Sequence, residues 1–270
     1  HLFGYDLPLQ ELKNFRQWGS KTPGHPEYGH TQGVETTTGP LGQGFANAVG
    51  MAAAEERLAA EFNQPGYELF HHYTYVYAGD GCMMEGVTSE AASLAGHLKL
   101  SRLVCLYDDN NITIDGSTEV AFTEDVGKRF AAYGWHILRV NDGNDLDAIA
   151  DAINEAQKET EKPSLIMVKT TIGYGSPNKQ GLSDAHGAPL GVEEVKHTKE
   201  NLGWPAETSF YVPEEVRQHF AQLTTKLEEK KAEWDRRFEE YRKKYPEAAE
   251  TWDRWHRPGL PQEAEADETL

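Results

Sequence analysis

The sequence contains few cysteines. Only two occur in its 270 residues, Cys82 and Cys105. They lack the CxxC spacing typical of metal and redox motifs, and two are too few for a disulfide framework. We therefore expect both to be buried free thiols.

Basic residues are also scarce, with 26 Lys and Arg against 44 Asp and Glu and a formal net charge of -18. A negative charge of this size repels phosphate backbones, which argues against nucleic acid as a partner. Any anionic ligand must therefore be held by local backbone dipoles or by a metal ion.

Long apolar runs are missing as well. Hydrophobic residues make up 38% of the chain, and no run approaches the ~20 apolar residues that a membrane-spanning helix needs. The chain does not open with the charged, apolar and small-residue regions of a secretory signal, although a signal that had been removed would leave no trace. We expect a cytoplasmic protein without membrane contact.

Between residues 70 and 170 the chain alternates short β-rich runs with amphipathic stretches. This pattern predicts an α/β domain in which crossover helices cover both faces of a parallel β-sheet. The expected strands span residues 73–78, 103–107, 135–140 and 165–170, and the expected helices 85–98, 123–133 and 145–159.

Two glycine-rich segments flank this region. The first, TTTGPLGQG, runs into an alanine-rich helical pattern that begins near Gly42, so a loop is expected to lead into a helix N-terminus. The second, IGYGSPNKQGLSDAHGAPLG, starts at Ile172 and is too rich in Gly, Ser and Pro for regular structure. It is expected to be an ordered functional loop or a mobile one.

Residues 214–245 carry apolar side chains at helical spacing among many charges, which predicts a long amphipathic helix or a helical pair. Such an element is either an arm that packs across the domain or a partner-binding helix. The last residues are acidic and lack aromatic side chains, so they predict a disordered tail. We expect an α/β domain over residues 1–205, a helical arm over 206–256 and the tail over 257–270.

The motif AGDGCMMEG occupies residues 78–86, where a predicted strand ends and a helix begins. Gly79 and Gly81 allow the backbone to turn tightly and approach a ligand, and the N–H groups of the helix start can receive a diphosphate. Asp80 is placed to hold a metal ion. A lone GDG is nevertheless common in plain turns.

The motif YDDNNITIDG begins at Tyr107, at the end of the next predicted strand. Parallel strands end at one edge of a sheet, where α/β proteins bind ligands, so Asp80 and Asn110 are expected to meet there. A carboxylate oxygen, an amide oxygen and a main-chain carbonyl are hard ligands that suit Mg²⁺ or Ca²⁺. Diphosphate oxygens and a water would complete the coordination.

A GDG followed about 30 residues later by an asparagine pair resembles the thiamine diphosphate signature. Longer stretches resemble the transketolase family itself, from residue 1 to about 205: TPGHPEYGHTQGVETTTGPLGQG, GDGCMMEG, SLAGHLKL, YDDNNITIDG, KPSLIMVKTTIGYGSPNK and HGAPLG. The helical region after Glu214 is also similar to the arm that links the first two domains of transketolases. The chain is identified on these motifs as similar to the diphosphate-binding domain of that family.

The resemblance implies roles for individual residues. It implies that Asp80, Asn110 and the Ile112 carbonyl are metal ligands, and that His25 and His186 are catalytic and touch the diphosphate or the substrate hydroxyls. A further set is implied to contact the cofactor, with Ile172 near its thiazolium ring and Glu85 in a carboxylate network at a subunit interface. The cofactor-binding set is Gly39, Leu41, Gly79, Asp80, Gly81, Asn110, Ile172 and His186.

Simpler interpretations remain for several of these residues. A histidine between prolines, such as His25, is often only an exposed loop residue, and His186 stands in a loop where a solvent-facing imidazole is the default. GPLGQG is GxxGxG rather than the dinucleotide fingerprint GxGxxG, and no convincing strand precedes it, so a Rossmann site is rejected.

The family transfers two-carbon ketol units from a ketose phosphate to an aldose phosphate, in the pentose phosphate pathway or in carbon fixation. Relative to it, the chain starts inside the first domain and stops before the second, so we expect half a site and no activity without a complementary segment or subunit. A homo-oligomer, such as a dimer, is expected. A related enzyme such as dihydroxyacetone synthase, or a non-catalytic cofactor-binding scaffold, remains an alternative.

Overall fold

A computed structural model describes residues 1–257. Its centre is a four-stranded sheet of β1 (Thr74–Gly79), β2 (Leu103–Asp109), β5 (His136–Val140) and β6 (Ser164–Lys169), in the order β1-β2-β6-β5. All three strand pairs are parallel. The carboxyl ends of the four strands therefore share one edge of the sheet.

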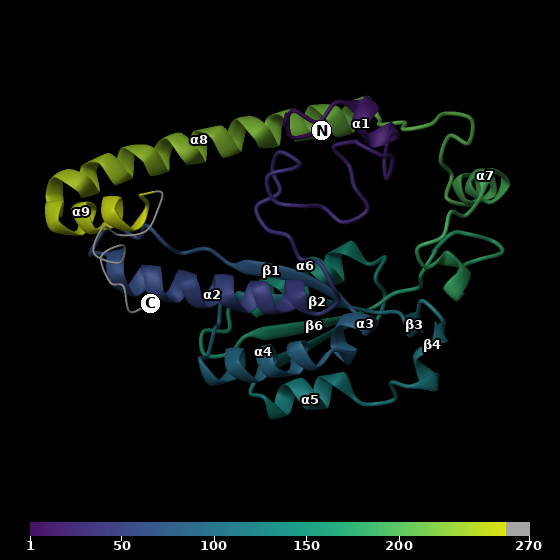
Figure 1. Ribbon diagram of the computed structural model, residues 1–270, viewed down its shortest axis with the longest axis horizontal. Helices are drawn as coiled ribbons and strands as arrows, with labels where there is room; N and C mark the ends of the chain where they lie inside the picture. The colour runs from purple at the N-terminus through teal and green to yellow at the C-terminus, as the bar shows by residue number, and fades with distance from the viewer. Residues whose placement is uncertain (258–270) are drawn as a thin grey trace, which may run out of the picture.

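Helices cover both faces of this sheet, as the sequence predicts (Figure 1). One face packs against α2 (Gln43–Phe62), α4 (Gly86–His97) and α5 (Val126–Ala132), and the opposite face packs against α6 (Leu146–Ala156). Every strand and helix expected between residues 43 and 170 is present, with ends that differ by at most three residues. The predicted α/β fold with crossover helices is confirmed.

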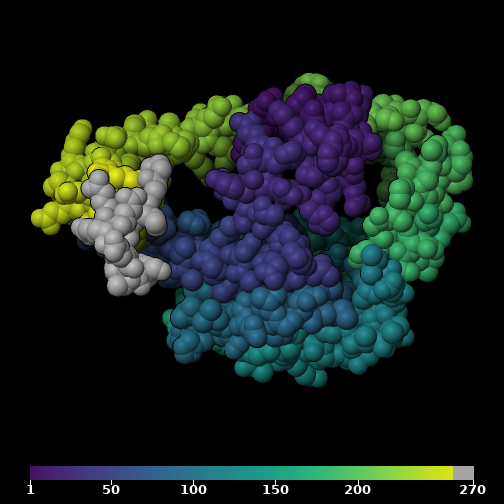
Figure 2. Space-filling view, in the orientation of Figure 1, coloured from purple at the N-terminus to yellow at the C-terminus, as the bar shows by residue number. Residues whose placement is uncertain are grey.

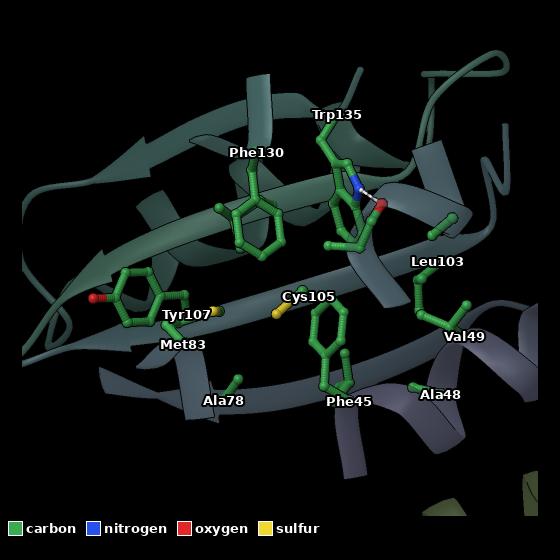
Figure 3. Close-up of a cluster of buried hydrophobic side chains, with 14 of the residues drawn as sticks. Phe45, Ala48, Val49, Ala78, Met83, Leu103, Cys105, Tyr107, Phe130 and Trp135 are labelled. Carbon is green, nitrogen blue, oxygen red and sulfur yellow. Dashed lines mark hydrogen bonds between the residues drawn. The ribbon is translucent and has the colours of Figure 1, made fainter. Parts of the chain in front are cut away.

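The hydrophobic cores on the two faces of the sheet explain the apolar sequence of β2. Successive residues of β2 point to opposite faces, so Cys105 and Tyr107 enter the core below α2 and α4, and Val104 and Leu106 enter the core beside α6. Figure 3 shows the first core, in which the Trp135 indole N–H donates to the Ala92 carbonyl over 2.8 Å. A strand segment buried on both faces must be apolar, which is the pattern of residues 103–107 in β2.

Some local structure was not expected. The segment after β1 forms a separate short helix, α3 (Asp80–Met84), before α4 begins. The asparagine motif leads into a small hairpin of β3 (Ile112–Thr113) and β4 (Gly116–Ser117), followed by the 3-10 helix η1 (Thr118–Val120). The 172–191 loop contains only the 3-10 helix η2 (Ser183–Ala185), and it runs into α7 (Val192–Asn201), which the sequence analysis missed.

The region after residue 213 is a helical pair. The 31-residue helix α8 (Glu214–Lys244) runs along one side of the molecule, and α9 (Pro246–Trp255) turns back against it (Figure 1). Tyr241 of α8 and Trp252 of α9 pack with Phe62 at the end of α2. This contact fixes one end of the arm to the α/β body.

The N-terminal segment, which includes α1 (Leu9–Lys13), contacts the other part of the arm. The Phe3 ring lies edge-on to that of Phe220, with centroids 4.8 Å apart. Figure 2 shows this segment in purple between the arm and the α/β body. The expected acidic tail, residues 257–270, lies outside the described residues except for its first residue.

Candidate functional site

Asp80 lies at the carboxyl edge of the sheet, directly after β1, and its side chain is only 3% exposed. Both carboxylate oxygens accept hydrogen bonds from the end of the neighbouring strand. The Tyr107 hydroxyl donates to Oδ1 over 2.5 Å, and the Asn111 backbone N–H donates to Oδ2 over 2.9 Å. The carboxylate is therefore held in one orientation between the ends of β1 and β2.

The protonation states of Asp80 and Tyr107 follow from their surroundings. Burial raises the pKa of Asp80, while the hydrogen bonds from Tyr107 and Asn111 oppose that rise. Burial, and then the Asp80 carboxylate itself, raise the pKa of Tyr107 well above its usual range. The phenol therefore keeps its proton at neutral pH and acts as a hydrogen-bond donor.

The asparagine pair forms a tight turn after β2. Asn111 adopts a left-handed conformation with φ of 61°, which asparagine tolerates better than most residues, and its N–H faces Asp80. The Asn110 side-chain oxygen accepts from the Ile112 N–H over 2.9 Å. Asp80 thus contacts the asparagine turn through the backbone of Asn111, whereas the Asn110 side chain bonds within the turn.

The glycine-rich loop before α2 packs over the start of α3. A Cβ at Gly81 would lie 3.0 Å from Leu41 Cδ1, so the absence of a side chain allows this contact. Gly42 has φ of 82°, and a Cβ there would approach Thr88 and Glu85 to within 2.9 Å. The loop also lines a cavity of about 350 Å³, which extends to Cys82 and the outer side of β1.

This packing joins several of the predicted cofactor residues. Gly79 ends β1 and Gly81 follows Asp80 in α3, with Leu41 against Gly81. Gly39, two residues before Leu41, has φ of 60° and is exposed. Glycines thus occur where the chain turns and where a neighbouring side chain packs against the backbone.

The end of β6, which neighbours β2 on the side opposite to β1, also contacts the asparagine turn. Lys169 bonds to the Asn111 side-chain oxygen and pairs with Asp109 over 3.4 Å, and the Thr170 hydroxyl donates to Asp108. The loop carrying Ile172 and His186 starts here. Ile172 is half-buried and its carbonyl accepts from the Gly181 N–H, whereas the His186 ring is exposed.

Two other predicted residues stand apart from this cluster. His25 is exposed in the connection between α1 and α2, and no hydrogen bond within residues 1–257 joins it to Asp80 or to the asparagine turn. Glu85 is exposed at the junction of α3 and α4. Cys82 is half-exposed while Cys105 is buried, so the expectation of two buried thiols holds only for Cys105.

The donor atoms expected at this edge from Asp80, Asn110 and Ile112 are all oxygens. Residues 1–257 contain no cluster of three or more His, Cys, Asp or Glu side chains suited to a metal. Asp80 is the one carboxylate in the proposed set, beside amide and carbonyl oxygens. Such hard oxygen donors suit Mg²⁺ or Ca²⁺, and phosphate oxygens commonly supply the remaining ligands of Mg²⁺.

Sequence reasoning missed three contributors to this edge: the Tyr107 hydroxyl, the Asn111 N–H and the Lys169 ammonium. Tyr107 reads as a core residue, because it alternates with the apolar residues of β2. Its hydroxyl reaches the strand ends while its ring stays in the core (Figure 3). One sequence feature could have indicated this role: Tyr107 is the last residue of the run 103–107 and directly precedes the motif DDNN.

The fold and this edge define a parallel α/β domain whose strand-end loops form a site for a phosphate-bearing cofactor. The chain belongs to the transketolase family. The family model described as "Transketolase, thiamine diphosphate binding domain" matches residues 1–261.

Individual relatives agree with this assignment. A transketolase from Halalkalibacterium halodurans is 62% identical over 92% of this chain and 37% of its own length, and a chloroplastic transketolase from Spinacia oleracea is 58% identical over 92% of this chain and 34% of its own. The chain therefore spans little more than a third of these curated relatives.

Solved structures show the same likeness. A transketolase from Leishmania mexicana superposes with a TM-score of 0.94 at 46% identity, over 99% of this chain and 40% of that one. A Pichia stipitis transketolase in complex with sedoheptulose 7-phosphate superposes with a TM-score of 0.89 at 52% identity, over 92% of this chain and 37% of that one. No helix within residues 1–257 is long and apolar enough to cross a membrane.

Proposed function

We propose that this chain supplies the diphosphate- and metal-binding half of a transketolase active site. The main observation behind the proposal is the hydrogen bonding of Asp80. Its buried carboxylate accepts hydrogen bonds from the Tyr107 hydroxyl and the Asn111 N–H where β1 and β2 end. A buried carboxylate at this edge is costly to the fold unless it is hydrogen-bonded, and it offers a fixed ligand to a cation. Membership of the transketolase family supports thiamine diphosphate as the cofactor.

In this proposal Asp80, the Asn110 side chain and the Ile112 carbonyl hold Mg²⁺ or Ca²⁺, and the cation holds the diphosphate. The cofactor is lined by Gly39, Leu41, Gly79 and Gly81. The contact between Leu41 and Gly81 brings the loop before α2 next to the start of α3. The Asn110 side chain exchanges its bond to the Ile112 N–H for the cation. Ile172 contacts the ring region of the cofactor.

The reaction proposed for the complete enzyme is transfer of a two-carbon ketol unit from a ketose phosphate to an aldose phosphate. When bound, thiamine diphosphate supplies the electron sink for cleavage of a carbon–carbon bond. This chain's share is to orient the diphosphate through Asp80 and, through the imidazoles of His25 and His186, to bind substrate hydroxyls and move protons. Sugar phosphates are supported as substrates by the Pichia stipitis complexes with sedoheptulose 7-phosphate and xylulose 5-phosphate.

A second segment completes the site in this proposal, either from a longer chain or from another subunit. Glu85, exposed on the outer side of the α3–α4 junction, is proposed to contact that segment in a homo-oligomer, such as a dimer. We further propose a diphosphate-binding unit over residues 1–205 and a linking arm over 206–256. Cytoplasmic localisation and a place in the pentose phosphate pathway are part of the same proposal.

Calorimetric titration of thiamine diphosphate into the chain with Mg²⁺ tests the proposal. Binding is expected for the native sequence and is expected to disappear in Asp80→Ala. Asp151→Ala is the matched control, because Asp151 is an exposed carboxylate on α6, away from the asparagine turn. Equal binding by all three proteins would refute the role of Asp80, and no binding by the native chain would refute a cofactor site formed by this chain.

A further inference from the structure

The loop between β6 and α7 is tied to α7 by an internal set of hydrogen bonds. It leaves the sheet at Thr170, beside the asparagine turn, and returns at Gly191 to start α7. Glycine- and proline-rich loops of this length are commonly mobile unless side chains order them. The ordering contacts are therefore informative about what the loop does.

The central contact is the carboxylate of Glu194, in the first turn of α7. It accepts hydrogen bonds from the Asn178 side-chain amide over 2.8 Å, the Asn178 backbone N–H over 2.9 Å and the Ser176 hydroxyl. Glu194 is 8% exposed and Ser176 is 2% exposed. A buried carboxylate with three donors from one loop fixes the position of that loop relative to the helix.

Further contacts hold the rest of the loop in place. The Lys179 ammonium donates to the Leu190 carbonyl over 3.0 Å, which closes the segment between them. Ala185 lies inside that segment, and a Cβ at Gly173 would lie 2.9 Å from the Ala185 Cβ, so the chain at Gly173 packs closely on η2. Ile172 precedes Gly173 and His186 follows Ala185, so this contact brings their two segments together.

We propose that Glu194 is a positioning residue, whose carboxylate fixes the 172–191 loop so that Ile172 and His186 keep one place at the carboxyl edge of the sheet. The inference rests on the proposed function, because it takes the ligand of that loop to be thiamine diphosphate. Loss of the Glu194 contacts should therefore release the loop and weaken the binding of thiamine diphosphate, while the core of the sheet stays unchanged.

Hydrogen exchange in the chain without ligand tests whether Glu194 fixes the loop. In Glu194→Gln the amides of Asn178, Gly181 and His186 should exchange at least ~10-fold faster, because the replacement amide cannot accept all three donors. Amides of β2 should exchange as in the native chain. Glu193→Gln is the matched control, since Glu193 is an exposed carboxylate in the same turn of α7 and has the same charge.

Calorimetry tests the effect on the cofactor. With Mg²⁺ present, Glu194→Gln should bind thiamine diphosphate ~5- to 10-fold more weakly than the native chain, the loss expected for contacts made by a disordered loop. Glu193→Gln should leave this affinity unchanged. Asn178→Ala, which removes a donor from the loop side, should repeat the pattern if Glu194→Gln does not fold.

Unchanged exchange in Glu194→Gln and Asn178→Ala would overturn the positioning role. Faster exchange of the β2 amides in Glu194→Gln would also overturn it, because general damage to the domain would open the core as well as the loop. If the native chain does not bind thiamine diphosphate, the proposed function fails, and the exchange measurement still decides whether Glu194 fixes the loop.

Discussion

The Tyr107 hydroxyl lies 2.5 Å from Asp80 Oδ1, so a core tyrosine of β2 holds the carboxylate that follows β1. The ring is fixed on its other sides by the core, where Tyr107 is 2% exposed. A rigid donor of this kind limits the rotamers of the carboxylate and orients it before any ligand binds.

Replacement of Tyr107 by phenylalanine removes this donor and leaves the ring in place. Because Asp80 is buried and loses a hydrogen bond to its carboxylate, we expect the free energy of unfolding to fall by ~1.5–3 kcal/mol and the Mg²⁺-dependent affinity for thiamine diphosphate to fall ~10-fold. Urea unfolding and calorimetry measure the two effects. Tyr133→Phe is the control, since Tyr133 packs on Phe130 near the opposite edge of the sheet. An affinity that does not change would limit Tyr107 to a structural role.

Metal and cofactor should bind cooperatively. The proposed protein ligands contain only one carboxylate, Asp80, so the cation needs the diphosphate oxygens to complete its coordination. We expect Mg²⁺ to tighten the binding of thiamine diphosphate ~10-fold or more, and the cofactor to tighten the binding of Mg²⁺ by the same factor. Titrations of each ligand with and without the other measure both factors. Independent binding of the two would contradict a shared site.

The Glu194 contacts should make stability depend on pH in the acidic range. Hydrogen bonds from the Asn178 side chain, the Ser176 hydroxyl and the Asn178 N–H lower the pKa of Glu194 to about 2, from a usual value of 4.5. A lowered pKa in the folded state means that this stabilisation is complete above pH 4.5 and is lost as the pH falls toward 2.

The stability difference between the native chain and Glu194→Gln should therefore be largest near pH 6 and should shrink between pH 4.5 and pH 3. Urea unfolding at each pH measures it. The exposed Glu193 supplies the control substitution, Glu193→Gln, for which a smaller pH dependence is expected. A Glu194→Gln difference that stays constant with pH would contradict the lowered pKa.

An ion pair between a buried glutamate and a partly exposed arginine joins α2 to the turn before β2. Glu55 is 1% exposed, and Arg102 Nη1 lies 3.2 and 3.1 Å from its two carboxylate oxygens. Arg102→Leu leaves the carboxylate buried without its partner, so we expect a loss of ~3 kcal/mol in the free energy of unfolding.

The double variant Glu55→Leu with Arg102→Leu should recover most of that loss, because no buried charge remains. Urea denaturation of the single and double variants measures the difference. Arg57→Leu is the control, since Arg57 lies on the same helix and pairs with Glu61 at the surface. A double variant no more stable than Arg102→Leu alone would show that packing by the arginine stem matters more than its charge.

Local sequence pattern predicted the sheet, its covering helices and the position of Asp80 at the end of a strand. Apolar runs such as residues 103–107 are buried on both faces, and glycines mark the turns between elements, so local pattern and tertiary environment agree there. It also predicted that Asp80 and the asparagine pair end neighbouring strands, because parallel strands share a carboxyl edge.

Which atoms meet at that edge depends on tertiary packing and could not be predicted from the sequence. The Asp80 carboxylate contacts the Asn111 N–H and the Tyr107 hydroxyl rather than the Asn110 side chain, and this depends on strand register and on the left-handed turn at Asn111. Likewise, Ser176 and Glu194 are 18 positions apart in a region without periodicity, so their contact left no local signal in the sequence. Spacing along a chain constrains helices and strands, whereas side-chain contacts between loops depend on how the whole fold packs.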